Sequence, residues 1–389
     1  MIAYRIMMKK INLFTALLCA LVIVTTPSFS QEAKDSIKTY PGGEAHSVKT
    51  YPHDFTGDRP KNVILFIGDG MGVAQVYAGL TANKGNLFLE NFKHIGFTKT
   101  YSANRYITDS AAAATAIATG QKTDNGVIGM DPDQQSVKNI TESASKRGIA
   151  AGIVATSSIT HATPGAFVAH QRNRSQEEEI ALDFLASGID VFIGGGVDFF
   201  TKREDGRDLI NEFTRQGYAV KQDLEEIRSF EGSKLLGLTA PRANGRLSDR
   251  GDMLPISTET AINVLKQNEK GFFLMVEGSF IDSGGHANNT IQIVEEVLDL
   301  DRAIGKALDF AAKDGQTLIV VASDHETGGM TINGGSFESG MVKGEFTTGG
   351  HTGVMTPIFA YGPGASEFGG IMENTDIHAK IYKLLFGEK

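Results

Sequence analysis

Cysteine is almost absent from this chain. The single cysteine among 389 residues is Cys19, which lies inside an N-terminal apolar segment. An intramolecular disulfide is therefore excluded, so the fold must be stabilised by its core, by bound metal or by assembly. Proline is also scarce, with 10 residues against 45 glycines. That ratio is typical of a chain with many tight turns around a sheet.

Basic residues are fewer than acidic ones, with 37 lysines and arginines against 46 aspartates and glutamates. The formal net charge is −9, and it would be −12 without Arg5, Lys9 and Lys10. Nothing in this balance indicates a nucleic-acid-binding surface. Beyond the N-terminal segment, no apolar run reaches the roughly 18 residues of a membrane-spanning helix.

Residues 1–30 have the pattern of a secretory signal peptide. A basic start precedes an apolar run over residues 11–24, and small residues lead up to Ser30. A run of that length is short for a membrane span, although a permanent N-terminal anchor is the alternative. We therefore expect a periplasmic or secreted protein with no membrane segment after signal removal.

Residues 31–60 form a distinct stretch in which residues 36–41 are nearly repeated as residues 47–52. Two copies are too few for a repeat fold. We interpret the stretch as an N-terminal arm, either clasping a neighbouring subunit or serving as a linker. No linker interrupts residues 61–389, which we expect to form one catalytic domain.

Short apolar runs alternate with longer amphipathic segments along this domain. Continuously apolar strands alternating with helices predict a mostly parallel sheet covered on both faces, a three-layer α/β/α sandwich of the α/β class. The clearest expected strands are residues 63–67, 149–155, 191–193, 272–276, 317–322 and 357–361. The clearest expected helices are residues 136–147, 176–186, 258–268 and 291–312.

Polar side chains follow several of these strands directly. In a parallel sheet, sites form just beyond the carboxyl ends of the strands. We therefore expect these residues to meet at one edge of one sheet. They are Asp69, His161, Thr163, Glu277, Asp282, Asp324 and His325.

The segment from Glu277 to His286 is the strongest local metal-binding pattern. Asp282 and His286 are four residues apart, which places them on one side of a helical turn. Carboxylate and imidazole ligands suit zinc at a catalytic site. The alternative is a solvated acidic loop.

For the other candidate metal ligands, the interpretation depends on the structure around them. Asp69 lies in a Gly-Asp-Gly segment, which is either a plain turn or a carboxylate held for a cation. Asp324 and His325 can share a metal only if the preceding strand has ended, because neighbours in a strand point to opposite faces. His351 lies among glycines, where a structural core histidine would be unusual.

Ser110 precedes an alanine run and is expected at or beside a helix N-terminus, either as a plain N-cap or as a nucleophile facing a bound phosphate. Thr163 and Glu277 offer oxygen ligands of the kind that magnesium accepts. Arg172 and Arg174 could hold a phosphoryl group, or form a surface ion-pair cluster with the glutamates at 177–179.

Six segments, taken together and in order, resemble the bacterial alkaline phosphatase family over about residues 60–365. They are residues 67–72, 108–115, 161–164, 276–286, 324–325 and 351–353. The resemblance implies hydrolysis of phosphate monoesters through a phosphoserine intermediate, with release of inorganic phosphate. It also implies a cofactor set of two zinc ions and one magnesium ion.

The resemblance assigns a role to each site residue. Ser110 matches the nucleophile and Arg174 matches the arginine that holds the phosphate. Arg172 matches that arginine less well, because it lies two residues too close to the segment 161–164. The ligands of the first zinc match Asp282, His286 and His351. Those of the second zinc match Asp69, Asp324 and His325, and those of magnesium match Thr163, Glu277 and the other oxygen of Asp69.

Two positions depart from the pattern of some family members. His161 stands where they have aspartate, so it either binds the third metal directly, which favours zinc, or hydrogen-bonds a magnesium-bound water. Ser283 stands where they have lysine, which predicts weaker retention of phosphate.

The sequence thus predicts a metal-dependent phosphomonoesterase acting on small-molecule phosphate monoesters, expected as a homodimer. A phosphodiesterase or sulfatase-like relative on the same metal core is one alternative. A non-catalytic exported metal-binding protein is the other.

Overall fold

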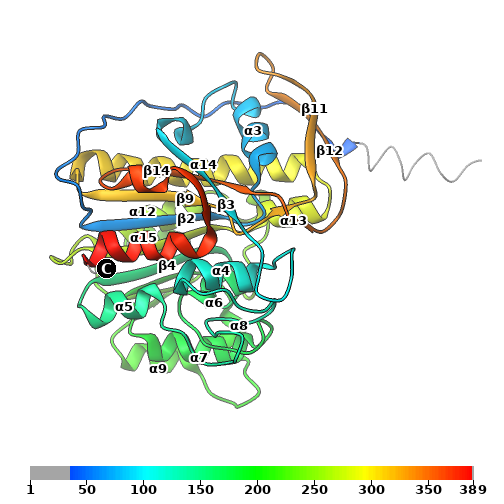
Figure 1. Cartoon of the computed structure of the whole chain (residues 1–389). Coiled ribbons are helices and arrows are strands. Elements are labelled where there is room, and N and C mark those ends of the chain that lie inside the picture. The colour runs from blue at the N-terminus through cyan, green and yellow to red at the C-terminus, as the bar shows by residue number, and fades with distance from the viewer. Residues whose placement is uncertain (1–35, 388–389) are drawn as a thin grey trace, which may run out of the picture.

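The computed structural model describes residues 36–387, which are built around a ten-stranded sheet (Figure 1). Strand β14 is antiparallel to both of its neighbours, and the other neighbouring strands pair in parallel. The predicted mostly parallel sheet is therefore confirmed. In their order across the sheet, the strands are β15 (Gly370–Glu373), β3 (His94–Lys99), β14 (Thr356–Tyr361), β9 (Thr317–Ala322), β2 (Asn62–Gly68), β8 (Phe272–Gly278), β4 (Ala150–Ser158), β5 (Val191–Gly195), β7 (Leu235–Leu238) and β6 (Ala219–Lys221).

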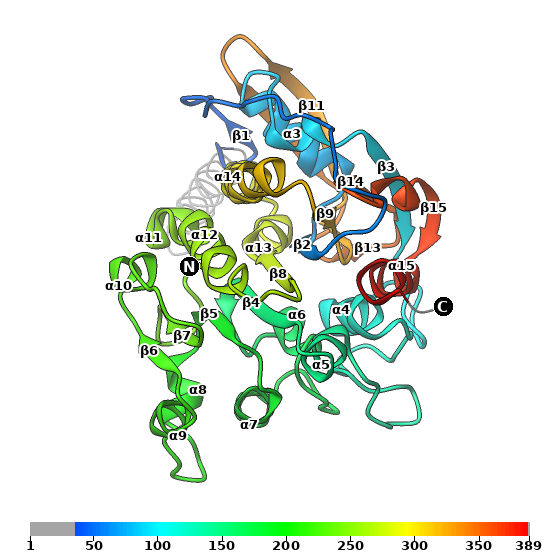
Figure 2. The ribbon, with the colours of Figure 1, turned by 90° about the vertical axis from the view of Figure 1, so that its left-hand side faces the viewer.

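Helices cover both faces of the sheet, as the view along the strands shows (Figure 2). Side chains alternate across β2, so Leu65 packs on one helical layer and Phe66 on the other. One layer contains α4 (Ser110–Thr119), α5 (Ile140–Lys146), α6 (Ala162–Ala166), α7 (Glu177–Ser187), α9 (Leu209–Arg215) and α15 (Asn374–Phe386). The other contains α3 (Val73–Ala82), α10 (Leu224–Arg228), α12 (Met253–Leu265) and α14 (Thr290–Asp314).

The six expected strands are all present, with ends that differ from the prediction by at most a few residues. Two expected helices differ more. Helix α5 starts later than predicted because Asn139 caps it, accepting a hydrogen bond from the backbone N–H of Glu142 at 2.9 Å. Helix α12 starts earlier, since Pro255 lies in its first turn, where a missing N–H costs nothing.

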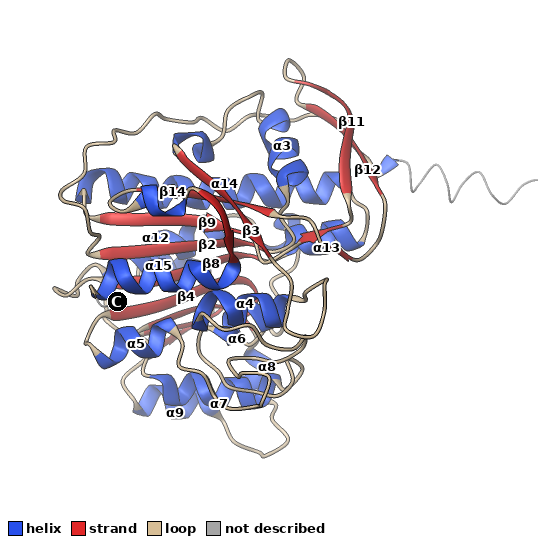
Figure 3. Ribbon diagram, viewed as in Figure 1, coloured by secondary structure: helices blue, strands red, loops and turns tan. Residues whose placement is uncertain are grey.

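Small elements surround the carboxyl edge of the sheet (Figure 3). Helix α13 (Phe280–His286) follows β8, and the short strands β10 (Glu326–Thr327) and β13 (His351–Thr352) pair beside it. The hairpin of β11 (Met330–Ser336) and β12 (Met341–Phe346) extends away from the main sheet. The remaining short helices are η1 (Phe88–Asn91), α8 (Val197–Thr201), α11 (Leu247–Arg250) and η2 (Ala365–Phe368).

The described part of the N-terminal arm lies against its own chain. Strand β1 (Thr39–Tyr40) pairs with β12, and the Tyr51 hydroxyl donates to Asp309 on α14 at 2.9 Å. The predicted signal peptide, residues 1–30, lies outside the described residues. Within residues 36–387, no helix has both the length and the apolar character needed to cross a bilayer.

Candidate active site

The structure brings the predicted polar residues together at the carboxyl edge of the sheet. Three groups of side chains each place their ligand atoms within 4.8 Å of one another. The groups are Asp282 with His286 and His351, Asp69 with Asp324 and His325, and Asp69 with His161 and Glu277. Asp69 joins the second group to the third, and the ring of His351 stacks on that of His325 with centroids 3.6 Å apart, so the three groups are contiguous.

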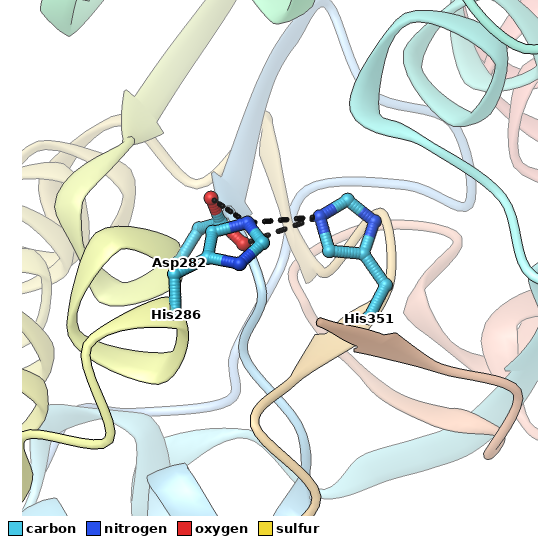
Figure 4. A group of neighbouring side chains, drawn as sticks. All are labelled: Asp282, His286 and His351. Carbon is cyan, nitrogen blue, oxygen red and sulfur yellow. Dashed lines mark hydrogen bonds and ion pairs between the residues drawn. The ribbon is translucent and has the colours of Figure 1, made fainter. Parts of the chain in front are cut away.

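The first group joins α13 to strand β13 (Figure 4). The Nε2 atom of His286 lies 3.3 Å from Oδ2 of Asp282 and 3.2 Å from Nε2 of His351. Asp282 and His286 share one helical face, as their four-residue spacing predicted. Two imidazole nitrogens and a carboxylate that converge in this way are ligand types that a zinc ion accepts.

The second group lies beside Ser110. Strand β9 ends at Ala322, so Asp324 and His325 are free to point to the same side. The Nε2 atom of His325 is 3.2 Å from Oδ2 of Asp324 and 3.6 Å from Oδ1 of Asp69. It is also 3.2 Å from the Ser110 hydroxyl oxygen.

The third group is largely buried, with His161 as its one partly exposed member. Glu277 is the penultimate residue of the fully buried strand β8, and its Oε2 accepts a hydrogen bond from Ser157 at 3.2 Å. Thr163 is fully buried in α6, two residues after His161. Oxygen ligands of this kind suit magnesium, whereas the His161 nitrogen suits zinc.

Unpaired buried atoms show that these groups fit metal ions. Oδ1 of Asp69, Oδ2 of Asp324, Oε1 of Glu277 and Nδ1 of His161 are buried with no hydrogen-bond partner. An uncompensated buried carboxylate oxygen is costly, and cations bound in the second and third groups would satisfy these four atoms.

The histidine rings are oriented by their other nitrogen atoms. Nδ1 of His286 lies 2.7 Å from the Gly349 carbonyl oxygen, and Nδ1 of His351 lies 2.9 Å from the Thr108 carbonyl oxygen. A hydrogen bond from Nδ1–H to a carbonyl leaves the Nε2 lone pair facing the ligand group, which is the tautomer a metal requires.

Burial and crowded charge shift the acidities of the site. Burial, together with the negative charges of Asp324 and Asp282, raises the pKa of Asp69 well above its usual value. Burial also raises the pKa of Glu277 to about 7. Burial and the charge of Arg174 lower the pKa of His161 to about 4, so its ring stays neutral.

The pair formed by Asp282 and His286 behaves differently. Their hydrogen bond raises the pKa of His286 to about 9. Burial opposes ionisation of Asp282, but its bonds to His286 and Thr327 and the charge of His325 hold the pKa of Asp282 below its usual value. In the absence of metal the two side chains therefore form an ion pair.

Helix α4 presents Ser110 at its N-terminus. The N-cap is Asp109, whose Oδ1 accepts a hydrogen bond from the Ala112 N–H at 3.0 Å. Capping is therefore done by the neighbouring residue, and the buried Ser110 hydroxyl faces the ligand groups instead. The helix N-terminus adds a favourable potential for an anion at this point.

Arg174, rather than Arg172, reaches the site. Its Nη1 lies 3.2 Å from Oδ2 of Asp109 and its Nη2 lies 3.2 Å from Nε2 of His161. Arg172 is exposed and does not line the site. Ser110, Arg174, Asp282, Ser283 and His351 share a cavity of about 350 Å³, which is large enough for a small ligand.

The two glycines of the segment from Glu277 to His286 allow close packing. Gly284 and Gly285 both lie within helix α13. A β-carbon on Gly285 would lie 2.6 Å from the Thr327 carbonyl oxygen, and one on Gly284 would lie 2.8 Å from Ile293. Small residues therefore let α13 approach β10 and α14.

Several supporting residues of the site were not predicted from the sequence. Buried Glu326 accepts a hydrogen bond from Gln75 at 2.7 Å and another from Thr352, which fixes the strand that carries His351. Thr327 donates to Asp282 at 2.5 Å. In the sequence, their position directly after His325 was the one indication that Glu326 and Thr327 belong to the site.

Comparison with known proteins identifies the relatives of this chain. The family model for alkaline phosphatase matches residues 60–343. Alkaline phosphatase 3 of Bacillus subtilis (strain 168) is 33% identical, covering 97% of this chain and 98% of its own. Alkaline phosphatase of Escherichia coli (strain K12) is 30% identical, covering 90% of this chain and 92% of its own.

A solved structure of similar sequence shares the fold. Alkaline phosphatase from the Antarctic bacterium TAB5 superposes with a TM-score of 0.79 at 43% identity, covering 85% of this chain and 99% of that one. A histidine-to-aspartate mutant of the same enzyme, with magnesium bound in its M3 site, superposes equally well.

We predict that Glu277→Gln stabilises the metal-free protein at pH 8. The pKa of Glu277 is about 7 in the folded protein, above its usual value of 4.5. The free energy of unfolding therefore falls as the pH rises from 4.5 to 7, because the buried side chain must ionise. The glutamine side chain stays neutral and does not lose this stability. Without metal, the melting temperature at pH 8 should rise by roughly 2–5 °C relative to wild type, with no gain near pH 4.5.

Differential scanning fluorimetry with and without a chelator measures this effect. Exposed Glu231→Gln serves as the matched control and should leave both melting temperatures unchanged. A metal-free variant that melts below wild type at pH 8 would contradict the prediction.

Proposed function

Since this chain belongs to the alkaline phosphatase family, we propose that it hydrolyses phosphate monoesters through a covalent phosphoserine at Ser110. Family membership makes the chain a phosphatase, and the proposal concerns how its residues act. The observation that carries it is the Ser110 hydroxyl, which shares one cavity with Arg174 and lies beside two groups of metal-ligand side chains.

The residues around Ser110 suit in-line attack on a phosphoryl group. Arg174 is restrained by Asp109, so its guanidinium is held in place to bind two phosphoryl oxygens. The N–H groups of α4 face the same point. Ser110 attacks phosphorus, the alcohol leaves, and water then cleaves the phosphoserine to release inorganic phosphate.

We assign the first two ligand groups to zinc and the third, with Thr163, to a third metal ion. Divalent cations bound there would stabilise negative charge on the serine oxygen and on the leaving oxygen. Asp69 contributes an oxygen to each of the second and third groups. The unpaired buried atoms described above support this assignment.

The occupant of the third group depends on His161. The His161 ring is neutral and lies beside Glu277. If its nitrogen binds the metal ion directly, the third group favours zinc. If it hydrogen-bonds a water molecule on the metal ion instead, the third group favours magnesium. The TAB5 mutant with magnesium in its M3 site carries aspartate in place of a histidine. Magnesium binding by the aspartate mutant supports the view that the third group of this chain, which contains a histidine, has a weaker preference for magnesium.

We expect Ser110→Ala to abolish turnover of an aryl phosphate monoester. Loss of the nucleophile should lower kcat by roughly 10³-fold or more and remove the phosphate that acid quenching traps on the protein. Wild type should prefer the monoester to its matching diester. Initial rates at alkaline pH, with zinc and magnesium supplied, test both statements.

The control for this variant is Ser257→Ala, which removes a buried hydroxyl in α12 away from the site. It should retain both activity and the trapped phosphate. A phosphate label that persists in Ser110→Ala would refute the nucleophile, and a diester preference would favour the phosphodiesterase alternative.

Ser283 lines the cavity without a charge, so product phosphate should be held weakly. Ser283→Lys should lower the inhibition constant of inorganic phosphate by about 2–5-fold, as expected for one partly exposed charge pair. Ser283→Gln, with a long neutral side chain, controls for bulk. An inhibition constant that is unchanged by lysine would count against this explanation.

We also propose that the protein is an exported homodimer. Val73, Tyr77, Val354 and Met355 are exposed large apolar side chains that line one surface hollow, and their exposed fractions lie between 44% and 52%. Exposed apolar clusters of this kind are typical of protein interfaces. The hollow adjoins strand β13, which carries His351.

The double substitution Val73→Glu with Tyr77→Glu should shift a dimer to monomer, because charges cannot be buried unpaired. Light scattering after size-exclusion chromatography measures the mass. Ile371→Glu, at an apolar position on β15 that is 65% exposed, is the control and should remain dimeric. A wild-type monomer, or a variant that remains dimeric, would exclude this interface.

A further inference from the structure

The active-site cavity extends past the metal-ligand groups to a rim outside them. Strands β5 and β7 lie beyond β4 in the sheet, and the segments after their carboxyl ends turn toward the same edge. These segments contribute Phe199 from α8 and Arg242 from the loop after β7, and α13 contributes Phe280. We define these three side chains as the outer rim.

The loop that carries Arg242 is held firmly in place. The Asn244 N–H donates to the Thr156 carbonyl oxygen at 3.1 Å, and the Ala240 carbonyl oxygen accepts from the Gly196 N–H at 2.9 Å. A β-carbon on Gly195 would lie 1.8 Å from the Arg242 carbonyl oxygen. The backbone of the rim is therefore fixed to the sheet edge.

Phe280 contacts a buried network of ion pairs. The guanidinium carbon of Arg250 lies 5.8 Å from the Phe280 ring centroid. Arg250 itself is paired with Glu296 at 2.5 Å and Asp299 at 2.6 Å, and all three are buried. The ring of Phe280 is thus held by contact with a buried, ion-paired side chain.

The guanidinium of Arg242 is oriented but not neutralised. Its central carbon lies 5.1 Å from the Phe199 ring centroid, in cation–π contact, which limits the directions that it can take. Its nearest ion-pair partner, Asp198, is 3.9 Å away, and the arginine side chain is 72% exposed. A loose pair of this kind leaves most of the donors available.

The second arginine of the cavity is already engaged. Among the described residues that line it, the arginines are Arg174 and Arg242, and no lysine is present. Arg174 is bonded to Asp109 and His161, at the position proposed for the phosphoryl group. Glu177 also lines the cavity, but its Oε2 already accepts hydrogen bonds from Ser158 and Thr160.

We propose that Arg242 determines leaving-group specificity by favouring phosphate monoesters whose leaving alcohol carries a second anionic group, a carboxylate or another phosphate. This inference rests on the proposed function, since Arg174 and Ser110 hold the transferred phosphoryl group. The bond between phosphorus and the alcohol oxygen breaks, water supplies the oxygen of inorganic phosphate, and the anionic alcohol departs past the outer rim.

Two substrates with the same three-carbon skeleton test the proposal. Phosphoglycerate, esterified at its terminal hydroxyl, has a carboxylate on the leaving group, and glycerol phosphate has a hydroxyl there. We expect Arg242→Gln to lower the ratio of their kcat/KM values by about 2–5-fold, the size of one exposed ion pair. The value for glycerol phosphate should stay unchanged.

Three further measurements separate recognition from a structural role. Arg242→Lys keeps the charge and should retain part of the preference, whereas Arg172→Gln removes an exposed arginine outside the cavity and should retain all of it. Raising the ionic strength from about 0.05 M to about 0.5 M should reduce the preference of wild type, because an exposed ion pair is screened.

The outcomes distinguish this inference from the proposed function. If wild type hydrolyses neither substrate with metals bound, the proposed function fails. If it hydrolyses both and Arg242→Gln leaves their ratio unchanged, or lowers both values equally, Arg242 does not discriminate and the inference is overturned.

Discussion

Negative charge crowded into a buried place constrains the rest of this structure. Asp69, Glu277 and Asp324 lie fully buried within one cluster, and burial with mutual repulsion raises the pKa of Asp69 and Glu277. The nearby cation Arg174 is shared with Asp109 rather than with these carboxylates. Cations bound here would compensate charges that the fold itself gathers, so cation binding would stabilise this edge of the sheet directly.

Much of the architecture was predictable because its central strands are buried on both faces. Strands such as β2 and β9 appear in the sequence as unbroken apolar runs, and their positions were predicted closely. Strand β3 was missed because its residues alternate between buried and exposed over a short length. The reversed direction of β14 was also missed, since an apolar run carries no information about strand direction.

The site was predictable where spacing along the chain determines geometry. Asp282 and His286 share a helical turn, and Ser110 begins a helix, as local sequence indicated. Glu326 and Arg242 could not be found in this way, because their partners are distant in sequence and meet them only through the fold. The role of the glycine pair in α13 could not be read from the sequence either, because close packing and backbone flexibility both favour glycine.

Strand β14 also determines when the active site can form. It lies between β9 and β3, so the early strand β3 joins the sheet only after a strand from the last tenth of the chain has arrived. The proposed metal ligand His351 lies just before that same late strand. Assembly of the metal groups is therefore a late folding event with high contact order, and a partly synthesised chain holds exposed carboxylates rather than a working site.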